Sequence, residues 1–377
     1  MTKETFRCWA EIDRNALRHN AKVVRDRIGS AEMLAVVKAN AYGHGLLGVA
    51  GALEDDVQLF GVANLEEAIA VRESSAHPIV ILGPALPEER STIAEHGFMP
   101  TISTFEEAKG FDRLARNRAV GINFKIDTGM GRMGVPENDA VTLFKRVSAL
   151  PNIKIHSVST HLPVSDEDPA YTHDQLLRFE TDVKRLRTEV PGDYKAQVLQ
   201  SAGLLAFNRK IFDIVRAGIV LYGISPLPEF QEFLRPVMTW KTRVGLIRDM
   251  PKGSSISYGR TFITPRKMRV ATLTAGYADG YPRHLSNCEA AVLVRGQRCA
   301  LLGRVTMDLM MIDVGKIDNV QVGDEVVLIG RQHNEEISCA ELAKKAGTIT
   351  WEITTRIGSR VKRVFYDRDS RTANRES

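Results

Sequence analysis

The chain has 377 residues, enough for one large hydrophobic core and a second, smaller one. Hydrophobic residues make up 44% and charged residues 26%, which is the composition of a globular chain and excludes a disordered one. The net charge of +5 is spread among acidic residues, with no basic block interleaved with aromatics, so no nucleic-acid partner is predicted.

Neither a membrane span nor a metal site is predicted. No run of 18 apolar residues occurs, and residues 1–20 lack the apolar core of a signal peptide, so the expected location is the cytoplasm. The cysteines show no C-x-x-C pair and no zinc-ligand spacing with histidine. We expect free thiols in a reducing compartment. They are Cys8, Cys288, Cys299 and Cys339.

Residues 12–235 repeat an apolar, β-branched run, a polar turn and a helical stretch. A helix from Asp13 to about Arg27 is predicted before the first run. The runs cover 32–39, 58–64, 78–84, 99–104, 121–127, 154–162, 196–202 and 214–223. Eight strands alternating with helices predict a (β/α)8 barrel. A doubly wound open sheet is the alternative, but the count and the span of roughly 200 residues favour the barrel.

Residues 236–377 have a different character, with short strands separated by turns. Strands are expected over 237–250, 268–277, 289–296, 297–305, 309–315 and 324–330. One helix is expected at 339–346, and residues 1–11 are expected to pair with this second domain. The predicted fold is therefore an α/β barrel followed by a mostly β C-terminal domain.

The first candidate for chemistry is Lys38, in "LAVVKANAYGHG" (34–45). In a barrel it would end the first strand, at the face where barrel enzymes build their sites. Partial desolvation lowers the pKa of such a lysine and frees the amine to form a Schiff base with a carbonyl compound. The alternative is a lysine that merely leaves the core for solvent. Spacing alone leaves both interpretations open.

A G-x-G-x-x-G pattern occurs in "KIDTGMGRMG" (125–134). A dinucleotide site would need this pattern after the first strand of a βαβ unit, with an acidic residue about 20 positions later. Here it follows the fifth strand, and the apolar-rich stretch 141–152 covers the place of that acid. We therefore reject a dinucleotide site.

Further motifs follow in order to nearly the end of the chain: "STHLP", "QSA", "VRAGIVLYG", "SISYGRTFIT", "AGYADGYPR" and "GRVTMDLMMID". Together with the two stretches above, they resemble the alanine racemase family, whose members bind pyridoxal 5'-phosphate (PLP) and combine a barrel with a β-domain. The resemblance extends over both predicted domains.

The resemblance implies two bases that act on opposite faces of the substrate Cα and so interconvert L- and D-alanine. Lys38 would hold PLP as an aldimine and act as one base, and Tyr258 would act as the other. Arg216 would face the pyridine nitrogen, where a permanent positive charge disfavours ring protonation and hence transamination. His161 would hydrogen-bond Arg216. The alternative for Arg216, a surface ion pair, fits poorly with its apolar neighbours.

The resemblance also implies binding residues. Those around the PLP phosphate would be Tyr42, Ser201, Gly218 and Ile219. Arg132 and the backbone of Met307 would contact the substrate carboxylate. Lys125 matches a lysine that is often carbamylated and then neutralises and orients that arginine. Tyr277 and Asp308 would line the entryway.

In the family the second base comes from a partner subunit, so the resemblance implies a homodimer with shared active sites and a supply of D-alanine for peptidoglycan. Three positions depart from the family pattern: Gln200 for Asn, Ser359 for Tyr and Lys362 for Pro. The alternatives are a broad-specificity amino-acid racemase, a fold-related basic-amino-acid decarboxylase, and a non-catalytic PLP-binding regulator. The regulators are lone barrels, so the second domain with Tyr258 argues against that last alternative.

Overall fold

A computed structural model describes residues 6–115, 118–207 and 212–367. Their contacts divide into two compact units. The barrel unit comprises Leu17–Ala41 and Leu46–Arg235, and the β unit comprises the described residues of Met1–Ala16, Tyr42–Gly45 and Pro236–Ser377. Across the described ranges, no helix has the length and apolar character needed to span a bilayer.

Within the described residues, eight parallel strands close into a barrel because the last pairs with the first (β10 with β2) and β5 pairs with β6. The strands are β2 (Glu32–Val36), β3 (Leu59–Val62), β4 (Ile79–Ile81), β5 (Met99–Ile102), β6 (Val120–Asp127), β8 (Ile153–Ser159), β9 (Lys195–Gln200) and β10 (Ile214–Ala217). A short strand, β7 (Val135–Pro136), pairs with β6 outside the ring. Each strand lies within one of the predicted runs or begins one residue before it. The barrel prediction is therefore confirmed.

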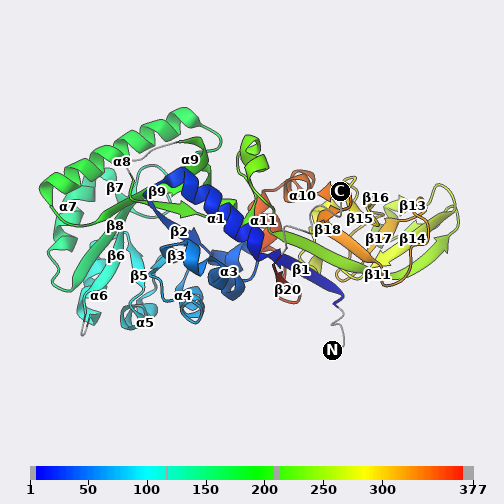
Figure 1. Cartoon of the computed structure of the whole chain (residues 1–377), viewed down its shortest axis with the longest axis horizontal. Helices are drawn as coiled ribbons and strands as arrows, with labels where there is room; N and C mark the ends of the chain where they lie inside the picture. Colours follow the sequence, from blue (N-terminus) through cyan, green and yellow to red (C-terminus); the bar gives the residue numbers. More distant parts are fainter. Residues whose placement is uncertain (1–5, 116–117, 208–211, 368–377) are drawn as a thin grey trace. The chain divides into compact units, whose positions relative to one another are not determined.

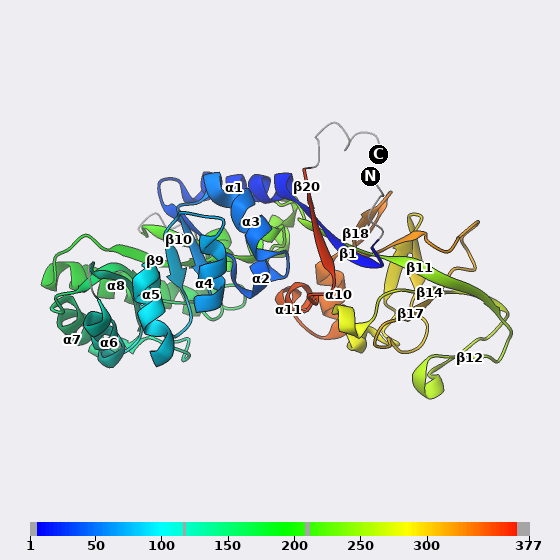
Figure 2. The same cartoon turned by 90° about the horizontal axis from the view of Figure 1, so that it is seen from below.

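Helices cover the outside of the strands, as α4, α5 and α6 do in Figures 1 and 2. The helices are α1 (Arg14–Ile28), α3 (Leu46–Leu53), α4 (Leu65–Arg72), α5 (Arg90–His96), α6 (Phe105–Leu114), α7 (Glu137–Ser148), α8 (Pro169–Glu189) and α9 (Ser201–Ala206). The 3₁₀ turns are η1 (Glu54–Asp56), η2 (Pro87–Glu89), η3 (Ile219–Tyr222) and η4 (Pro228–Phe233). Two of these helices begin at side-chain caps: Asn64 Oδ1 accepts from the Glu67 N–H at 3.0 Å, and Thr104 and Glu107 form a capping box.

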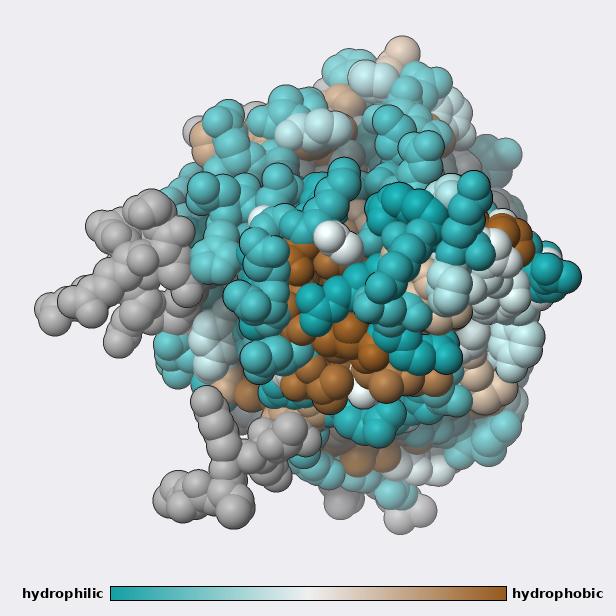
Figure 3. Space-filling view, turned by 90° about the vertical axis from the view of Figure 1, so that its right-hand side faces the viewer, coloured by the Kyte–Doolittle hydropathy of each residue, from teal (hydrophilic) through white to brown (hydrophobic). Residues whose placement is uncertain are grey.

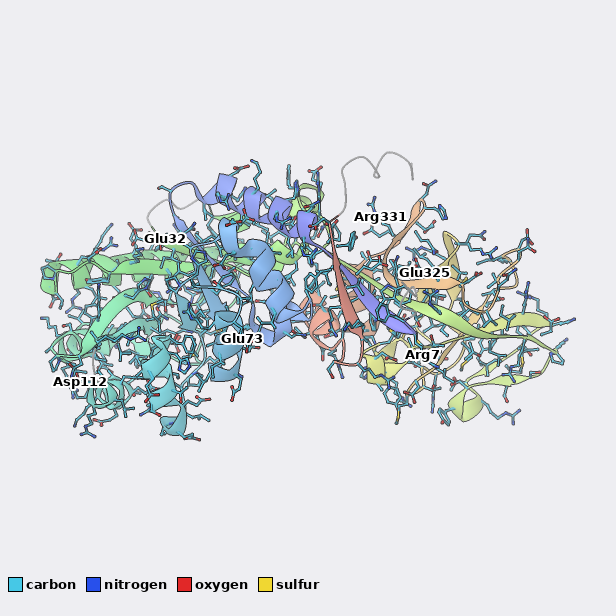
Figure 4. The ribbon with its side chains drawn as sticks, turned by 60° about the horizontal axis from the view of Figure 1, so that its bottom comes forward. Arg7, Glu32, Glu73, Asp112, Glu325 and Arg331 are labelled. Carbon is cyan, nitrogen blue, oxygen red and sulfur yellow. The ribbon has the colours of Figure 1, made fainter. Side chains whose placement is uncertain are left out.

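The barrel interior holds a buried polar cluster among its apolar side chains. Asn123 donates to the Thr101 hydroxyl at 3.1 Å, and Gln197 donates to the Ser157 hydroxyl at 2.8 Å. All four side chains are at most 2% exposed, so these bonds satisfy groups that would be costly to bury alone. At the start of β2, Glu32 (labelled in Figure 4) pairs with Lys195 at the start of β9.

The β unit is built on a second nine-stranded sheet with the order β16-β15-β18-β11-β1-β20, to which β14, β17 and β19 attach. Its strands are β1 (Cys8–Asp13), β11 (Met238–Met250), β14 (Met268–Leu273), β15 (Ala291–Val294), β16 (Gln297–Ala300), β17 (Met310–Asp313), β18 (Glu325–Gln332), β19 (Glu335–Ile337) and β20 (Lys362–Tyr366). β12 (Ser255–Ile256) and β13 (Phe262–Ile263) form a separate hairpin. The first strand, β1, lies between antiparallel β11 and parallel β20.

Short helical elements complete the β unit. They are α10 (Cys339–Ala346), α11 (Thr350–Thr355), η5 (Tyr258–Arg260), η6 (Tyr277–Asp279) and η7 (Arg283–Leu285). The helix predicted at 339–346 is observed as α10. The run predicted as a strand over 214–223 ends at Ala217, because the chain turns at Gly218 (φ −114°, ψ −108°) and continues as η3.

Candidate active site

The carboxyl ends of the barrel strands bring basic side chains together. Lys38 follows β2, Lys125 lies in β6, His161 follows β8 and Arg216 lies in β10. Arg132, from the loop after β6, joins them, and the positive charges of this group lower the pKa values of Lys38, Lys125 and His161. The barrel unit therefore assembles a strongly cationic site at the edge where barrel enzymes bind ligands.

Burial lowers the pKa of Lys38, and the guanidinium groups of Arg132 and Arg216 lower it further. Glu67 opposes this shift without cancelling it. An amine whose protonated form is disfavoured is available as a nucleophile toward a carbonyl carbon. Lys38 is half-buried in the structure, which favours the reactive lysine over one that leaves the core for solvent.

The residues immediately after Lys38, in α2 (Lys38–Tyr42), form a left-handed turn. Ala39, Asn40 and Ala41 have φ of 53°, 54° and 52°, a conformation that L-residues with a Cβ avoid. Hydrogen bonds compensate: the Ala39 N–H donates to Glu67 Oε1 at 2.6 Å, and Asn40 Oδ1 accepts from the Leu46 N–H at 2.8 Å. The chain therefore turns sharply just beyond the reactive amine.

Arg216 is buried and is held mainly by backbone carbonyls. Its Nη2 donates to Thr160 O at 2.6 Å and to Val198 O at 2.9 Å, and its Nη1 donates to Gln197 O at 3.1 Å. Among the described residues it has no carboxylate partner, and its Nε–H makes no hydrogen bond. Burial lowers its pKa to about 10. The surface ion pair is thus excluded, and one donor of the fork remains for a ligand.

His161 is neutral in this site. Burial, followed by the charge of Arg216, lowers the pKa of the imidazole to about 2. Nδ1 lies 3.4 Å from Arg216 Nη2, and because a guanidinium can only donate, Nδ1 is assigned as the acceptor. The proton of the neutral ring then sits on Nε2, which leaves His161 with an N–H to offer.

Lys125 is 8% exposed, and burial, with Arg216 and Arg132 nearby, lowers its pKa to about 7. The nearest carboxylate, Asp127, is already occupied: it accepts the N–H groups of Gly129, Met130 and Gly131 at 2.8–3.1 Å and so shapes the loop.

The Arg132 guanidinium is exposed, and it makes no hydrogen bond or ion pair with any residue of the described ranges. It is therefore open to an anionic ligand.

A cradle of amides lies after β9 and β10. The Ser201 hydroxyl, at the start of α9, accepts from the Gly218 N–H at 3.0 Å and from the Val220 N–H at 3.4 Å. These amides flank Ile219, so the predicted phosphate residues of the barrel unit converge. The neighbouring Gln200 points elsewhere, donating to Leu162 O at 3.3 Å.

The other candidates belong to the β unit and are described there on their own. Tyr258, in η5, is 71% exposed, and Met307 and Tyr277 are exposed as well. Tyr42 is buried, which raises the pKa of its phenol and keeps it protonated. Asp308 pairs with Arg360 at 2.8 Å.

Sequence reasoning missed an ion pair in the β unit between an exposed arginine and a buried aspartate. Arg360 binds both carboxylate oxygens of Asp279, at 2.7 and 2.8 Å, in addition to its contact with Asp308. Asp279 is 4% exposed and its Oδ2 also accepts the Gly276 N–H at 2.8 Å. The only sequence signal was an aspartate within "GYADG", which a turn would equally explain.

The barrel unit fits an anionic carbonyl cofactor. The acidic groups that act on Lys38 and Lys125 are Glu67 and Asp127, and both carboxylates already accept backbone N–H groups. A bound anion would therefore reduce the repulsion among the basic side chains. The amide cradle suits a phosphate. Lys38 suits an aldehyde, and the free Nε–H of Arg216 suits an unprotonated ring nitrogen. PLP combines all three groups.

A (β/α)8 barrel with a reactive lysine among arginines, followed by a mostly β unit, defines a class of PLP-dependent enzymes. Residues 12–226 match the alanine racemase N-terminal domain, and residues 237–365 match the alanine racemase C-terminal domain. The chain therefore belongs to the alanine racemase family, as its motifs predicted.

Individual relatives agree over the full length. An alanine racemase of Halothermothrix orenii is 43% identical over 368 residues, covering 95% of this chain and 96% of the relative. The solved alanine racemase of Clostridium difficile 630 has a TM-score of 0.91 and 32% identity, with 97% of each chain covered. That of Bartonella henselae, solved with covalently bound pyridoxal phosphate, has a TM-score of 0.87 and 28% identity, covering 96% of this chain and 100% of that one.

Proposed function

We propose that this protein is a PLP-dependent alanine racemase that interconverts L- and D-alanine with two bases. The observation that carries the proposal is Lys38, a lysine with a lowered pKa that lies at the carboxyl edge of the barrel with Arg132 and Arg216 nearby. Family membership over both domains supports the choice of alanine as substrate.

The residues would hold the cofactor as follows. Lys38 would bind PLP covalently, and the Ser201 hydroxyl with the amides of Gly218 and Ile219 would bind the phosphate, assisted by the protonated phenol of Tyr42. When bound, PLP withdraws electrons from the substrate Cα and makes its proton acidic. Arg132 would take the substrate carboxylate, for which a planar guanidinium is suited, together with the backbone of Met307.

Arg216 would control the electron demand of the ring. Its Nε–H can only donate, so a ring nitrogen facing it must keep its lone pair and stay unprotonated. A neutral pyridine is a weaker electron sink than a pyridinium, which favours return of the proton to Cα over transamination. The bonds from Arg216 to the carbonyls of Thr160 and Val198 would keep the guanidinium in place.

Lys38 would exchange a proton with one face of Cα, and Tyr258 with the other. The Nε2–H of neutral His161 would donate a hydrogen bond to the phenolic oxygen of Tyr258 and so stabilise negative charge on it.

Tyr258 would come from a partner subunit, which makes the active unit a homodimer. Its 71% exposure and the apolar patch, framed by hydrophilic side chains, on one face of the β unit in Figure 3 are consistent with a subunit interface. Tyr277 and Asp308 would line the entryway.

Lys125 would be carbamylated. At a pKa of about 7 much of the amine is neutral at physiological pH and can add to CO₂, releasing one proton and leaving an anionic carbamate. That anion would reduce the repulsion between Lys125 and the arginines and would orient Arg132. A cytoplasmic enzyme of this kind would supply D-alanine for peptidoglycan.

The alternatives share the fold and the cofactor. A broad-specificity racemase is suggested by Ser359, an exposed small residue where some family members carry tyrosine. A basic-amino-acid decarboxylase would release CO₂ from the substrate. The environment of Arg216 favours removal and return of the Cα proton over that reaction.

The test is a product analysis. The PLP-loaded protein is incubated separately with L-alanine, L-serine, L-lysine and L-arginine, and the products are resolved by chiral chromatography. Dominant D-alanine is expected. Another dominant D-amino acid would change the substrate while keeping the mechanism, and a diamine or agmatine product would overturn the racemase assignment.

The Lys38→Ala variant is the control for this test. It is expected to lack both turnover and the visible absorbance of lysine-bound PLP, because the amine that would bond to the cofactor has been removed. An alanine variant that retained both properties would contradict the role of Lys38.

A further inference from the structure

The loop that carries Arg132 is supported from outside the barrel by α8, the long green helix of Figure 1. Gln175 Nε2 and Arg178 Nη2 both donate to the backbone carbonyl of Thr128, each at 2.9 Å. Gln175 is fully buried, so its bond is shielded from competing water. Two donors from one helix thus fix the residue that starts the loop.

Thr128 also contacts Thr160, a residue that holds Arg216. The hydroxyls of Thr128 and Thr160 are 2.8 Å apart, and both side chains are at most 1% exposed. The backbone carbonyl of Thr160 in turn accepts from Arg216 Nη2 at 2.6 Å. A continuous chain of hydrogen bonds therefore runs from α8 through Thr128 and Thr160 to Arg216.

The loop has little freedom of its own. The Asp127 carboxylate accepts three successive N–H groups, and a Cβ added at Gly129 would meet the Tyr171 hydroxyl of α8 at 2.3 Å. Because Arg132 has no side-chain partner among the described residues, the place from which its side chain starts depends on this backbone.

We propose that the Thr128–Thr160 hydroxyl pair, held from outside by Gln175 and Arg178, positions Arg132 relative to Arg216. The two arginines would contact opposite parts of one ligand, the substrate carboxylate and the cofactor ring, so their separation must be fixed for the reacting atoms to align. The four residues are positioning residues, since none is proposed to touch the substrate. The catalytic part of this inference rests on the proposed racemase function.

The test compares Thr128→Val with Thr172→Val. Both changes replace a fully buried hydroxyl by a methyl group, but the Thr172 hydroxyl on α8 has no hydrogen-bond partner within the described ranges, whereas that of Thr128 does. Hydrogen exchange over residues 129–134 of the cofactor-free and PLP-loaded proteins should rise about five- to tenfold in Thr128→Val, as expected for the loss of one net hydrogen bond. It should not change in Thr172→Val.

Kinetics separate positioning from general stability. In Thr128→Val, KM for alanine should rise and kcat/KM should fall about 10- to 100-fold, the range expected for a displaced binding group. The visible absorbance of lysine-bound PLP should persist. Thr172→Val should keep wild-type values of both parameters.

Two further variants keep the inference testable if Thr128→Val folds poorly. Thr160→Val removes the same hydroxyl pair from the other side, and Gln175→Met removes one donor at similar volume. Loop exchange and KM unchanged in both would overturn the proposal. A wild-type protein that racemises nothing would instead refute the proposed function, while the exchange measurement would still decide whether α8 orders the loop.

Discussion

Tyr258 is the residue whose proposed role can be separated most cleanly from cofactor binding. Tyr258→Phe should retain the PLP absorbance but lose racemisation by about 100-fold or more, the usual contribution of a positioned acid or base. Because Lys38 would remain, the variant should still exchange the Cα proton of one enantiomer with deuterated solvent. Tyr194→Phe is the control and should remain active, because the Tyr194 hydroxyl donates to Val190 O at 3.3 Å and has no part in the proposed site. Equal exchange from both enantiomers in Tyr258→Phe would rule out the second base.

His161 should make the free energy of unfolding of the cofactor-free protein depend on pH below 6.5. Its folded-state pKa of about 2 lies below the reference value of 6.5. Between these values the unfolded chain binds a proton that the folded protein excludes, so this contribution to stability falls as pH falls from 6.5 toward 2. Above pH 6.5 both states are neutral and the contribution is constant.

Proton uptake on unfolding measures this effect. At pH 4.5, His161→Gln should take up about one proton fewer than the wild type, since one proton is the full linkage of a single imidazole. The same variant at pH 8 should show no difference from the wild type. An equal uptake at pH 4.5 would mean that the imidazole is already charged in the folded protein.

Among the elements, the left-handed turn of α2 should be improved by glycine. Ala39 is exposed and has φ of 53°, so Ala39→Gly removes a steric penalty without losing buried surface. We expect a gain of about 0.5–1 kcal/mol in the free energy of unfolding, after the entropic cost of glycine.

Ala70→Gly is the matched control for that turn. It lies within the right-handed helix α4, where glycine should cost about 1 kcal/mol. Urea denaturation of both variants measures the two effects, and changes of the same sign would contradict the strain assigned to the turn.

The elements also show what sequence patterns can and cannot predict. All eight barrel strands, and helices such as α8 and α10, were predictable because hydrophobic periodicity and capping residues are local signals. The turn of α2 was not, since alanine and tyrosine carry no signal for positive φ. The turn η3 was not predictable either, because the same apolar run is compatible with a strand and with a buried turn.

The site was predictable in a different way. Its motifs identified Lys38, Arg132 and Arg216 by resemblance, but not the carbonyls that hold Arg216 or the Thr128–Thr160 pair. Such contacts join residues distant in sequence, and they depend on the register of neighbouring strands. The pairing of Arg360 with Asp279 was missed for the same reason.

For the whole molecule, the position of β1 predicts how a truncation would behave. Removing residues 1–13 would take a central strand out of the sheet and leave β11 and β20 without their shared partner. We expect hydrogen exchange to become fast in β20, which pairs only with β1, and in those amides of residues 238–242 of β11 that face β1. It should stay slow in barrel strands such as β8 and β9, which serve as the internal control. Protection of β20 and of those β11 amides in the truncated protein would show that β1 is dispensable.

The same strand has a consequence for how the chain is made. A ribosome synthesises β1 first, yet its neighbours β11 and β20 emerge only after the entire barrel sequence. Barrel strands pair mostly with near neighbours in sequence and can form during translation, whereas β1 stays unpaired until β11 and β20 have been made. The nascent chain thus carries an open strand edge while the barrel is synthesised, the stage at which a chaperone or a second nascent chain can bind it.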